Sequence, residues 1–85
     1  MILSWAAKGW EDYLYWQNRD KKMVKRINAL INDILRHPFE GIGDPEPLKY
    51  QGSGYGSRRI DRKHRLVYKA TNEAIVVVQC RYHYD

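Results

Sequence analysis

The side chains of greatest chemical interest are one glutamate, one histidine and several cations in the second half of the chain. Glu46 lies between two prolines, Lys49 follows three residues later, and His83 stands two residues before Asp85. Arg59 and Arg65 lie in segments where apolar and polar residues alternate. A carboxylate, an imidazole and guanidinium groups are the ingredients of RNA strand cleavage without a metal.

That reaction uses the 2′-hydroxyl of RNA as nucleophile, so it needs a base, cations that hold charge on the phosphorane, and an acid for the departing 5′-oxygen. Glu46 can act as the base. Arg65, Arg59 and Lys49 can hold the phosphate, the arginines through two parallel donors. His83 can act as the acid, because imidazole titrates near neutral pH. A splayed base could stack on Tyr84, Tyr82 or Tyr55.

Each of these residues also has an ordinary structural explanation. A histidine near a chain end is commonly a surface residue, and a glutamate between prolines could simply be exposed. Arginines on strands usually form salt bridges, and Tyr68 and Tyr82 could fill the core or the sheet. The nuclease hypothesis therefore depends on whether the residues meet in space.

Three strands must carry most of these residues. The alternation covers residues 57–61, 64–70 and 74–84, with short turns at 62–63 and 71–72. Side chains alternate between the two faces, so helices that cover one face leave the other free. On the last strand we expect Val76, Val78 and Cys80 in the set opposite the polar one. The polar side chains expected on the free face are Arg59, Arg65, Lys69, Arg81 and His83.

The first half of the chain supplies a strand and two helices. Residues 2–5 form a short apolar run, and residues 8–17 place apolar side chains on one helical stripe. Asp20 is a suitable N-cap for a second helix, which His37-Pro38 ends. We predict one domain over residues 1–85, an α+β fold of order β-α-α-β-β-β with both helices on one face of a twisted antiparallel sheet.

Composition bounds the class of protein. The chain has 85 residues, 44% of them hydrophobic and 29% charged, which excludes a disordered tail or a membrane protein. The single cysteine excludes an internal disulfide and fits a reducing cytosol. Residues 49–85 hold eight Lys and Arg against three Asp and Glu, whereas residues 1–48 are balanced at seven each. This basic second half favours a polyanionic partner.

The chain resembles the YoeB/Txe family of bacterial toxin–antitoxin toxins, within the RelE/ParE superfamily. The resemblance spans the whole chain and departs from the family pattern in one place, where Asp85 follows the usual terminal tyrosine. The blocks that carry it are WEDYLYWQ (10–17), PFEG (38–41), PEPLK (45–49), SRRI (57–60), HRLVY (64–68) and CRYHY (80–84).

The resemblance implies a RelE-like, ribosome-dependent endoribonuclease that cuts mRNA in the ribosomal A site, without a cofactor or metal, in the cytoplasm. It also implies a cognate antitoxin of the Phd/YefM type and a homodimer, for which the surplus Trp and Tyr of the first helix are suited. By position, the family's catalytic residues fall on Glu46, Arg65, His83 and Tyr84, and its phosphate-binding cations on Lys49 and Arg59.

Two other functions are compatible with the same features. A toxin of this fold could instead poison a protein such as DNA gyrase without being an enzyme, in which case the set of Glu46, Arg65 and His83 is not needed. A passive RNA-binding module would touch phosphate only, and it predicts that Glu46→Ala leaves the biological effect intact.

Overall fold

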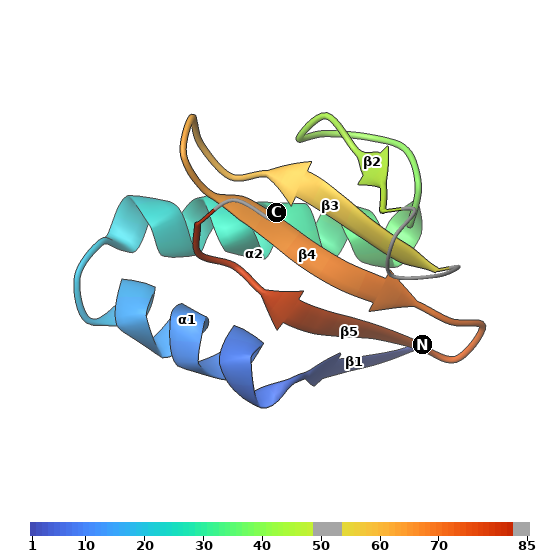
Figure 1. The fold of residues 1–85 in the computed structure, drawn as a ribbon, viewed down its shortest axis with the longest axis horizontal. Coiled ribbons are helices and arrows are strands. Elements are labelled where there is room, and N and C mark those ends of the chain that lie inside the picture. Colours follow the sequence, from blue (N-terminus) through green and yellow to red (C-terminus); the bar gives the residue numbers. More distant parts are fainter. Residues whose placement is uncertain (49–53, 83–85) are drawn as a thin grey trace.

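A computed structural model of the chain describes residues 1–48 and 54–82 (Figure 1). Two helices follow a first strand, and the remaining strands come after them. The elements are β1 (Ile2–Trp5), α1 (Ala7–Gln17), α2 (Lys21–Arg36), β2 (Glu46–Pro47), β3 (Tyr55–Arg59), β4 (Arg65–Ala70) and β5 (Ala74–Gln79). None of the helices in these ranges is long and apolar enough to span a bilayer.

The five strands form one sheet in the order β1-β5-β4-β3-β2, and both helices pack on one of its faces, as predicted. The pairs formed by β2, β3, β4 and β5 are antiparallel. The edge strand β1, however, is parallel to β5, so the sheet is mixed rather than wholly antiparallel. The intervening helices and strands allow this, because only directly connected hairpin strands must run antiparallel.

The core lies between α2 and the middle of the sheet. Asp20 caps α2 as predicted, its carboxylate accepting hydrogen bonds from the backbone N–H groups of Lys22 and Met23. Such a cap contributes about 1 kcal/mol. Residues three and four apart on α2 then face the sheet, and they are the chain's strongest helical stripe. The buried side chains of this stripe are Met23, Ile27, Leu30, Ile31 and Ile34.

The last strand differs from its prediction in length and in phase. β5 ends at Gln79, not at Tyr84, and Ile75 and Val77 are its core residues, whereas Val76 and Val78 are half-buried. Cys80 is also buried, because the chain leaves the strand after Gln79 and strict alternation ends there. The two-residue strand β2 was not predicted, because Glu46 lies between Pro45 and Pro47 and proline cannot donate a hydrogen bond to a neighbouring strand.

Candidate active site

The face of the sheet away from the helices gathers the predicted polar side chains. Directly paired residues of antiparallel strands point to the same face. Ser57 pairs with Glu46 on one side and with Val67 on the other, and Arg59 pairs with Arg65. The register therefore places Glu46, Arg59 and Arg65 on one face, as the alternation predicted for the two arginines.

Arg65 presents a positive charge that the described residues leave without a carboxylate partner. Its side chain is half-buried on β4, and its Nε donates to Ser57 Oγ at 3.0 Å. Its Nη2 donates to the carbonyl oxygen of Asp44 at 3.1 Å. Within residues 1–48 and 54–82 no acidic group forms an ion pair with it. A guanidinium oriented by neutral acceptors keeps its charge for an external anion.

Glu46 is exposed on the edge strand β2, between Pro45 and Pro47. Proline is tolerated at an edge because its missing N–H is not needed there. The backbone N–H of Leu48 still donates to Tyr55 at 3.0 Å, which ties this short strand to β3. The carboxylate is thus held by backbone geometry and is open to solvent.

Arg58 anchors the loop that leads into Glu46. It points to the helix side, is fully buried, and its Nη1 donates to Asp33 Oδ2 at 2.6 Å and to the carbonyl of Ile42 at 2.9 Å. Its Nη2 donates to the carbonyls of His37 and Glu40. The hydrogen bond from Arg58 holds the pKa of Asp33 below its usual range, and a second one from the Ile42 N–H adds to it. Arg58 is therefore a structural residue.

The same loop contains a glycine in a backbone conformation that other residues rarely adopt. Gly43 has φ of +82°, and a Cβ there would lie 2.7 Å from Leu30 Cδ2. Its carbonyl accepts a hydrogen bond from the N–H of Arg59 at 2.6 Å. Asp44 follows with φ of +54°, and its carboxylate is 3.7 Å from Arg59 Nη2. Both of these side chains are exposed, so the ion pair is weak and Arg59 can turn toward a phosphate.

Four hydrogen bonds fix the chain between the end of β5 and Tyr82. Cys80 N–H donates to buried Asp12 Oδ2 at 3.0 Å, and Cys80 C=O accepts from Trp16 Nε1 at 2.9 Å. Tyr82 N–H donates to His64 Nδ1 at 2.6 Å, and Tyr82 C=O accepts from the N–H of Arg65 at 3.0 Å. Tyr82 has φ of +67°, an uncommon conformation that these bonds enforce. The described chain thus ends against the strand that carries Arg65.

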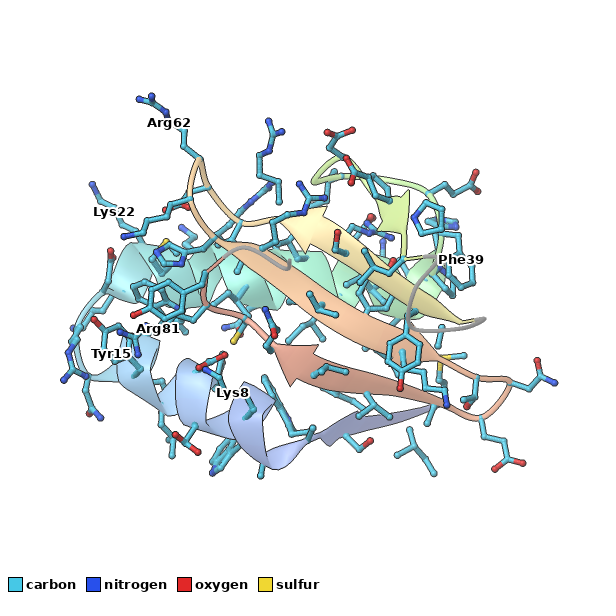
Figure 2. All side chains as sticks on the ribbon, in the orientation of Figure 1. Lys8, Tyr15, Lys22, Phe39, Arg62 and Arg81 are labelled. Atoms are coloured by element: carbon cyan, nitrogen blue, oxygen red, sulfur yellow. The ribbon has the colours of Figure 1, made fainter. Side chains whose placement is uncertain are left out.

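Arg81 does not share the face of Arg65, contrary to the prediction. Its guanidinium carbon lies 3.6 Å from the ring centroid of Tyr15 on α1, and Figure 2 shows the two side chains together. The reason is the early end of β5, since alternation does not continue past the last strand residue. Lys49, His83 and Tyr84, the other predicted site residues, lie outside the described residues.

Two residues of the site were not singled out from the sequence. Ser57 orients Arg65, and the alternation that placed Arg59 on this face also places Ser57 there. Asp44 contributes its backbone carbonyl, for which the sequence contains no signal. As for metals, residues 1–48 and 54–82 contain no group of three His, Cys, Asp or Glu side chains that could hold an ion.

Comparisons with known proteins identify the family and the fold. A family model described as YoeB-like toxin of bacterial type II toxin–antitoxin system matches residues 5–84. Toxin YoeB of Escherichia coli strain K12 is 56% identical over 84 residues, covering 99% of this chain and all of the relative. The solved structure of a YoeB/ParE toxin from Agrobacterium tumefaciens superposes with a TM-score of 0.93 at 48% identity, covering 99% of this chain and 100% of that one.

Two solved structures from Staphylococcus aureus show assemblies of similar proteins. One is a YoeB dimer, 47% identical with a TM-score of 0.92, and the other a heterotetrameric YoeB-YefM toxin–antitoxin complex, 47% identical with a TM-score of 0.88. Each covers 99% of this chain and 98% of the other.

Proposed function

Because the chain belongs to the YoeB-like toxins of bacterial type II toxin–antitoxin systems, we propose that it is an endoribonuclease that cleaves mRNA in the ribosomal A site and so stops translation. The observation that carries the proposal is the shared sheet face of Glu46 and Arg65, joined through Ser57. An exposed carboxylate that shares a sheet face with an oriented guanidinium, itself without a carboxylate partner among residues 1–48 and 54–82, fits a base and a phosphate-binding cation.

In this mechanism Glu46 takes the proton of the 2′-hydroxyl, and the 2′-oxygen attacks the adjacent phosphorus. Arg65, with Lys49 and Arg59, stabilises the charge of the phosphorane. The bond from phosphorus to the 5′-oxygen then breaks, and His83 supplies the proton that this oxygen needs. The products are a 2′,3′-cyclic phosphate and a 5′-hydroxyl, and no metal takes part. Tyr84 stacks on the exposed base.

The anchoring of the C-terminal segment supports this assignment. The carbonyl of Tyr82, the last described residue, accepts from the backbone N–H of Arg65, the proposed phosphate-binding arginine. The spatial requirement of the mechanism is that His83 and Glu46 meet across the guanidinium groups. An experimental structure with the two side chains on opposite sides in every state would contradict it.

Cleavage of mRNA on programmed ribosomes tests the proposal. The wild-type chain should cut the message and leave a 2′,3′-cyclic phosphate, whereas Glu46→Gln and His83→Gln should each lose activity. Glu73→Gln and His37→Gln change exposed residues outside the site and serve as matched controls. Intact mRNA under a toxin that still arrests growth would overturn the proposal and favour a protein target such as DNA gyrase.

The ribosome is the proposed partner because the protein has few groups with which to orient RNA by itself. Holding the message with its 2′-oxygen in line supplies an orientation effect that free RNA lacks. Naked RNA should therefore be cut far more slowly than ribosome-bound mRNA, and equal rates would contradict ribosome dependence. This function also implies a cytoplasmic location.

A YefM-type antitoxin and a second copy of the chain are the other proposed partners, by analogy with the S. aureus assemblies. The face proposed for dimerisation lies on α1 and β1. Trp10 is 46% exposed and packs edge-on against Trp5, with ring centroids 5.6 Å apart, and Leu14 and Ile2 are also exposed. Aromatic side chains of this kind are enriched in interfaces. Trp10→Ala should shift the mass measured by light scattering from dimer to monomer.

A further inference from the structure

The sheet face that carries Glu46 and Arg65 continues along β3 and β4 to a second pair of side chains. Tyr55 of β3 is paired directly with Lys69 of β4. Tyr55 lies two residues from Ser57 on the same strand, and residues two apart on a strand share a face. Lys69 is therefore on the face predicted for it. Figure 1 views the sheet from this face, with α2 behind β3 and β4.

Lys69 is a cation in an apolar setting. It lies on β4, where its partners on the two neighbouring strands are Tyr55 and Val76. Its Nζ is 5.3 Å from the centroid of the Tyr55 ring, and both residues are half-buried. Among residues 1–48 and 54–82, no carboxylate forms an ion pair with it. A partly desolvated charge without a counterion attracts an external anion more strongly than a fully hydrated one does.

Hydrogen bonds and the aromatic ring fix the position of this lysine. The N–H of Leu48 donates to the carbonyl of Tyr55 at 3.0 Å, which ties Tyr55 to the segment after β2. The N–H of Ala70 donates to the carbonyl of Gly54 at 2.7 Å, which closes the end of the β3–β4 pair beside Lys69. A cation held over an aromatic ring loses little side-chain entropy when it binds an anion.

The step along the sheet from the guanidinium of Arg65 to Lys69 suits two successive phosphates of one RNA strand. Arg65 Nε donates to Ser57 Oγ at 3.0 Å, so the guanidinium lies at the level of Ser57. Tyr55 and Lys69 are two residues further along their strands, which is about 7 Å at the usual rise. Proteins that bind single strands use such rows of cations to follow the nucleic-acid backbone.

We propose that Lys69, held in place by Tyr55, binds the mRNA phosphate next to the scissile one. This inference rests on the proposed function and extends its substrate site by one nucleotide. RNA is favoured over an acidic protein segment because Lys69 lies on the face proposed to hold the scissile phosphate, so the same strand reaches both Arg65 and Lys69.

Binding to 70S ribosomes programmed with an uncleavable message tests this contact. The message carries a 2′-methoxy group at the scissile nucleotide. In two further versions, the linkage on the 5′ or on the 3′ side of the scissile one is an uncharged methylphosphonate. Lys69→Gln should weaken binding to the ordinary message about fivefold at 0.1 M salt, the effect of one phosphate contact on a single strand. On one of the two neutral messages it should have no effect.

Arg36→Gln is the matched control for Lys69→Gln. It removes the same charge from an exposed residue at the end of α2, and it should bind every message as the wild type does.

Variants of Tyr55 test how the lysine is held. Tyr55→Phe keeps the ring and should bind as the wild type does. Tyr55→Leu should weaken binding about two- to fivefold, as expected for the loss of an exposed cation–π contact. Circular dichroism checks that both variants fold. Wild-type affinity of a folded Tyr55→Leu variant would overturn the role of the ring, and Lys69→Gln decides the phosphate contact if the leucine variant does not fold.

The possible results separate this inference from the proposed function. If the wild type cuts an ordinary message while Lys69→Gln binds the uncleavable one with unchanged affinity, the phosphate contact is overturned and the nuclease stands. If the loss in Lys69→Gln disappears on one neutral message while the wild type cuts nothing, the contact is supported and the nuclease is overturned. A loss that persists on both neutral messages would show that Lys69 meets another group, such as an acidic protein, and would also overturn the proposal.

Discussion

Arg58 and Arg59 are neighbours in sequence, and the pleat of β3 gives them opposite roles. Arg58 is buried toward α2, where it ties a loop together through Asp33 and three carbonyls. Arg59 is exposed on the face of Arg65. His64 also has a structural role, since its Nδ1 accepts a hydrogen bond from the N–H of Tyr82.

His64 is predicted to be a positioning residue for the C-terminal segment. Asparagine can offer an acceptor where Nδ1 lies, whereas leucine fills the space without one. His64→Asn should therefore keep most of the turnover on ribosomes, and His64→Leu should lower it about tenfold or more, in line with one lost orienting hydrogen bond of about 1.5 kcal/mol.

Single-turnover cleavage and ribosome affinity should be measured together for these His64 variants. A positioning role lowers the cleavage rate and leaves affinity unchanged. If leucine matched the wild type in rate while folding normally, the role assigned to His64 would be wrong.

The loop of residues 37–44 is the element that determines where Glu46 lies. It has no regular secondary structure, and its order comes from side chains of other elements. Arg58 binds its carbonyls, Asp33 accepts its Ile42 N–H, and Tyr68 donates its hydroxyl proton to the carbonyl of Pro38. The conformation of the loop therefore depends on these three side chains.

Arg58→Met should lower the free energy of unfolding by about 3–5 kcal/mol, because it removes the partner of Asp33 and of several carbonyls in a buried site. Arg59→Met is the matched control on the opposite face, and it should change stability by no more than about 0.5 kcal/mol. Urea denaturation measures both. Equal effects of the two substitutions would contradict the role of Arg58 in holding the loop of residues 37–44.

The hydrogen bond between Arg58 and Asp33 makes the stability of the protein sensitive to acid. The hydrogen bond from Arg58 lowers the pKa of Asp33 in the folded protein below the ordinary value of 3.8. The folded state thus binds the proton less readily than the unfolded state does. The contribution of Asp33 to stability is complete above about pH 4 and is lost as the pH falls through the folded pKa. The stability difference between the wild type and Asp33→Asn should shrink from pH 7 to pH 3, and a difference that stays constant would contradict this linkage.

At the scale of the whole molecule, β1 and the strand β2 that carries Glu46 lie at opposite edges of the sheet. Ile2 of β1 and Trp10 of α1 are exposed, whereas residues 15–26, 60–64 and 80–82 together hold eight Lys and Arg against two Asp. The proposed dimer contact therefore lies away from the proposed active site, and the open sheet face stays free for the scissile phosphate.

Cys80 provides a probe of global stability. Burial raises the pKa of its thiol to about 12, and the nearby carboxylate of Asp12 adds to the effect. At pH 8 the native thiol is therefore protonated as well as enclosed, and alkylation requires unfolding. Iodoacetamide should label native protein at least about 10³-fold more slowly than protein in urea. Rapid labelling of the native state would show that this end of the core opens locally.

The sequence by itself determined the two helices and the existence of the three hairpin strands, although β3 spans Tyr55–Arg59 rather than 57–61. It also supplied the candidate side chains for the chemistry. These follow from local periodicity, and the apolar stripe of α2 or the alternation around Arg59 and Arg65 needs no distant partner to be recognised. The same period of two places Arg58 and Arg59 on opposite faces of β3.

Only the tertiary structure decided the end of β5, the parallel pairing of β1, the place of Arg81 and the contact of α2 with the turn after β3. Each depends on contacts between residues far apart in sequence, such as Asp12 and Trp16 with Cys80, or Arg26 with Ile60. The alternation of polar and apolar residues cannot predict that the buried carboxylate of Asp12 accepts a hydrogen bond from the backbone N–H of Cys80. That hydrogen bond exists only once α1 and β5 have packed together.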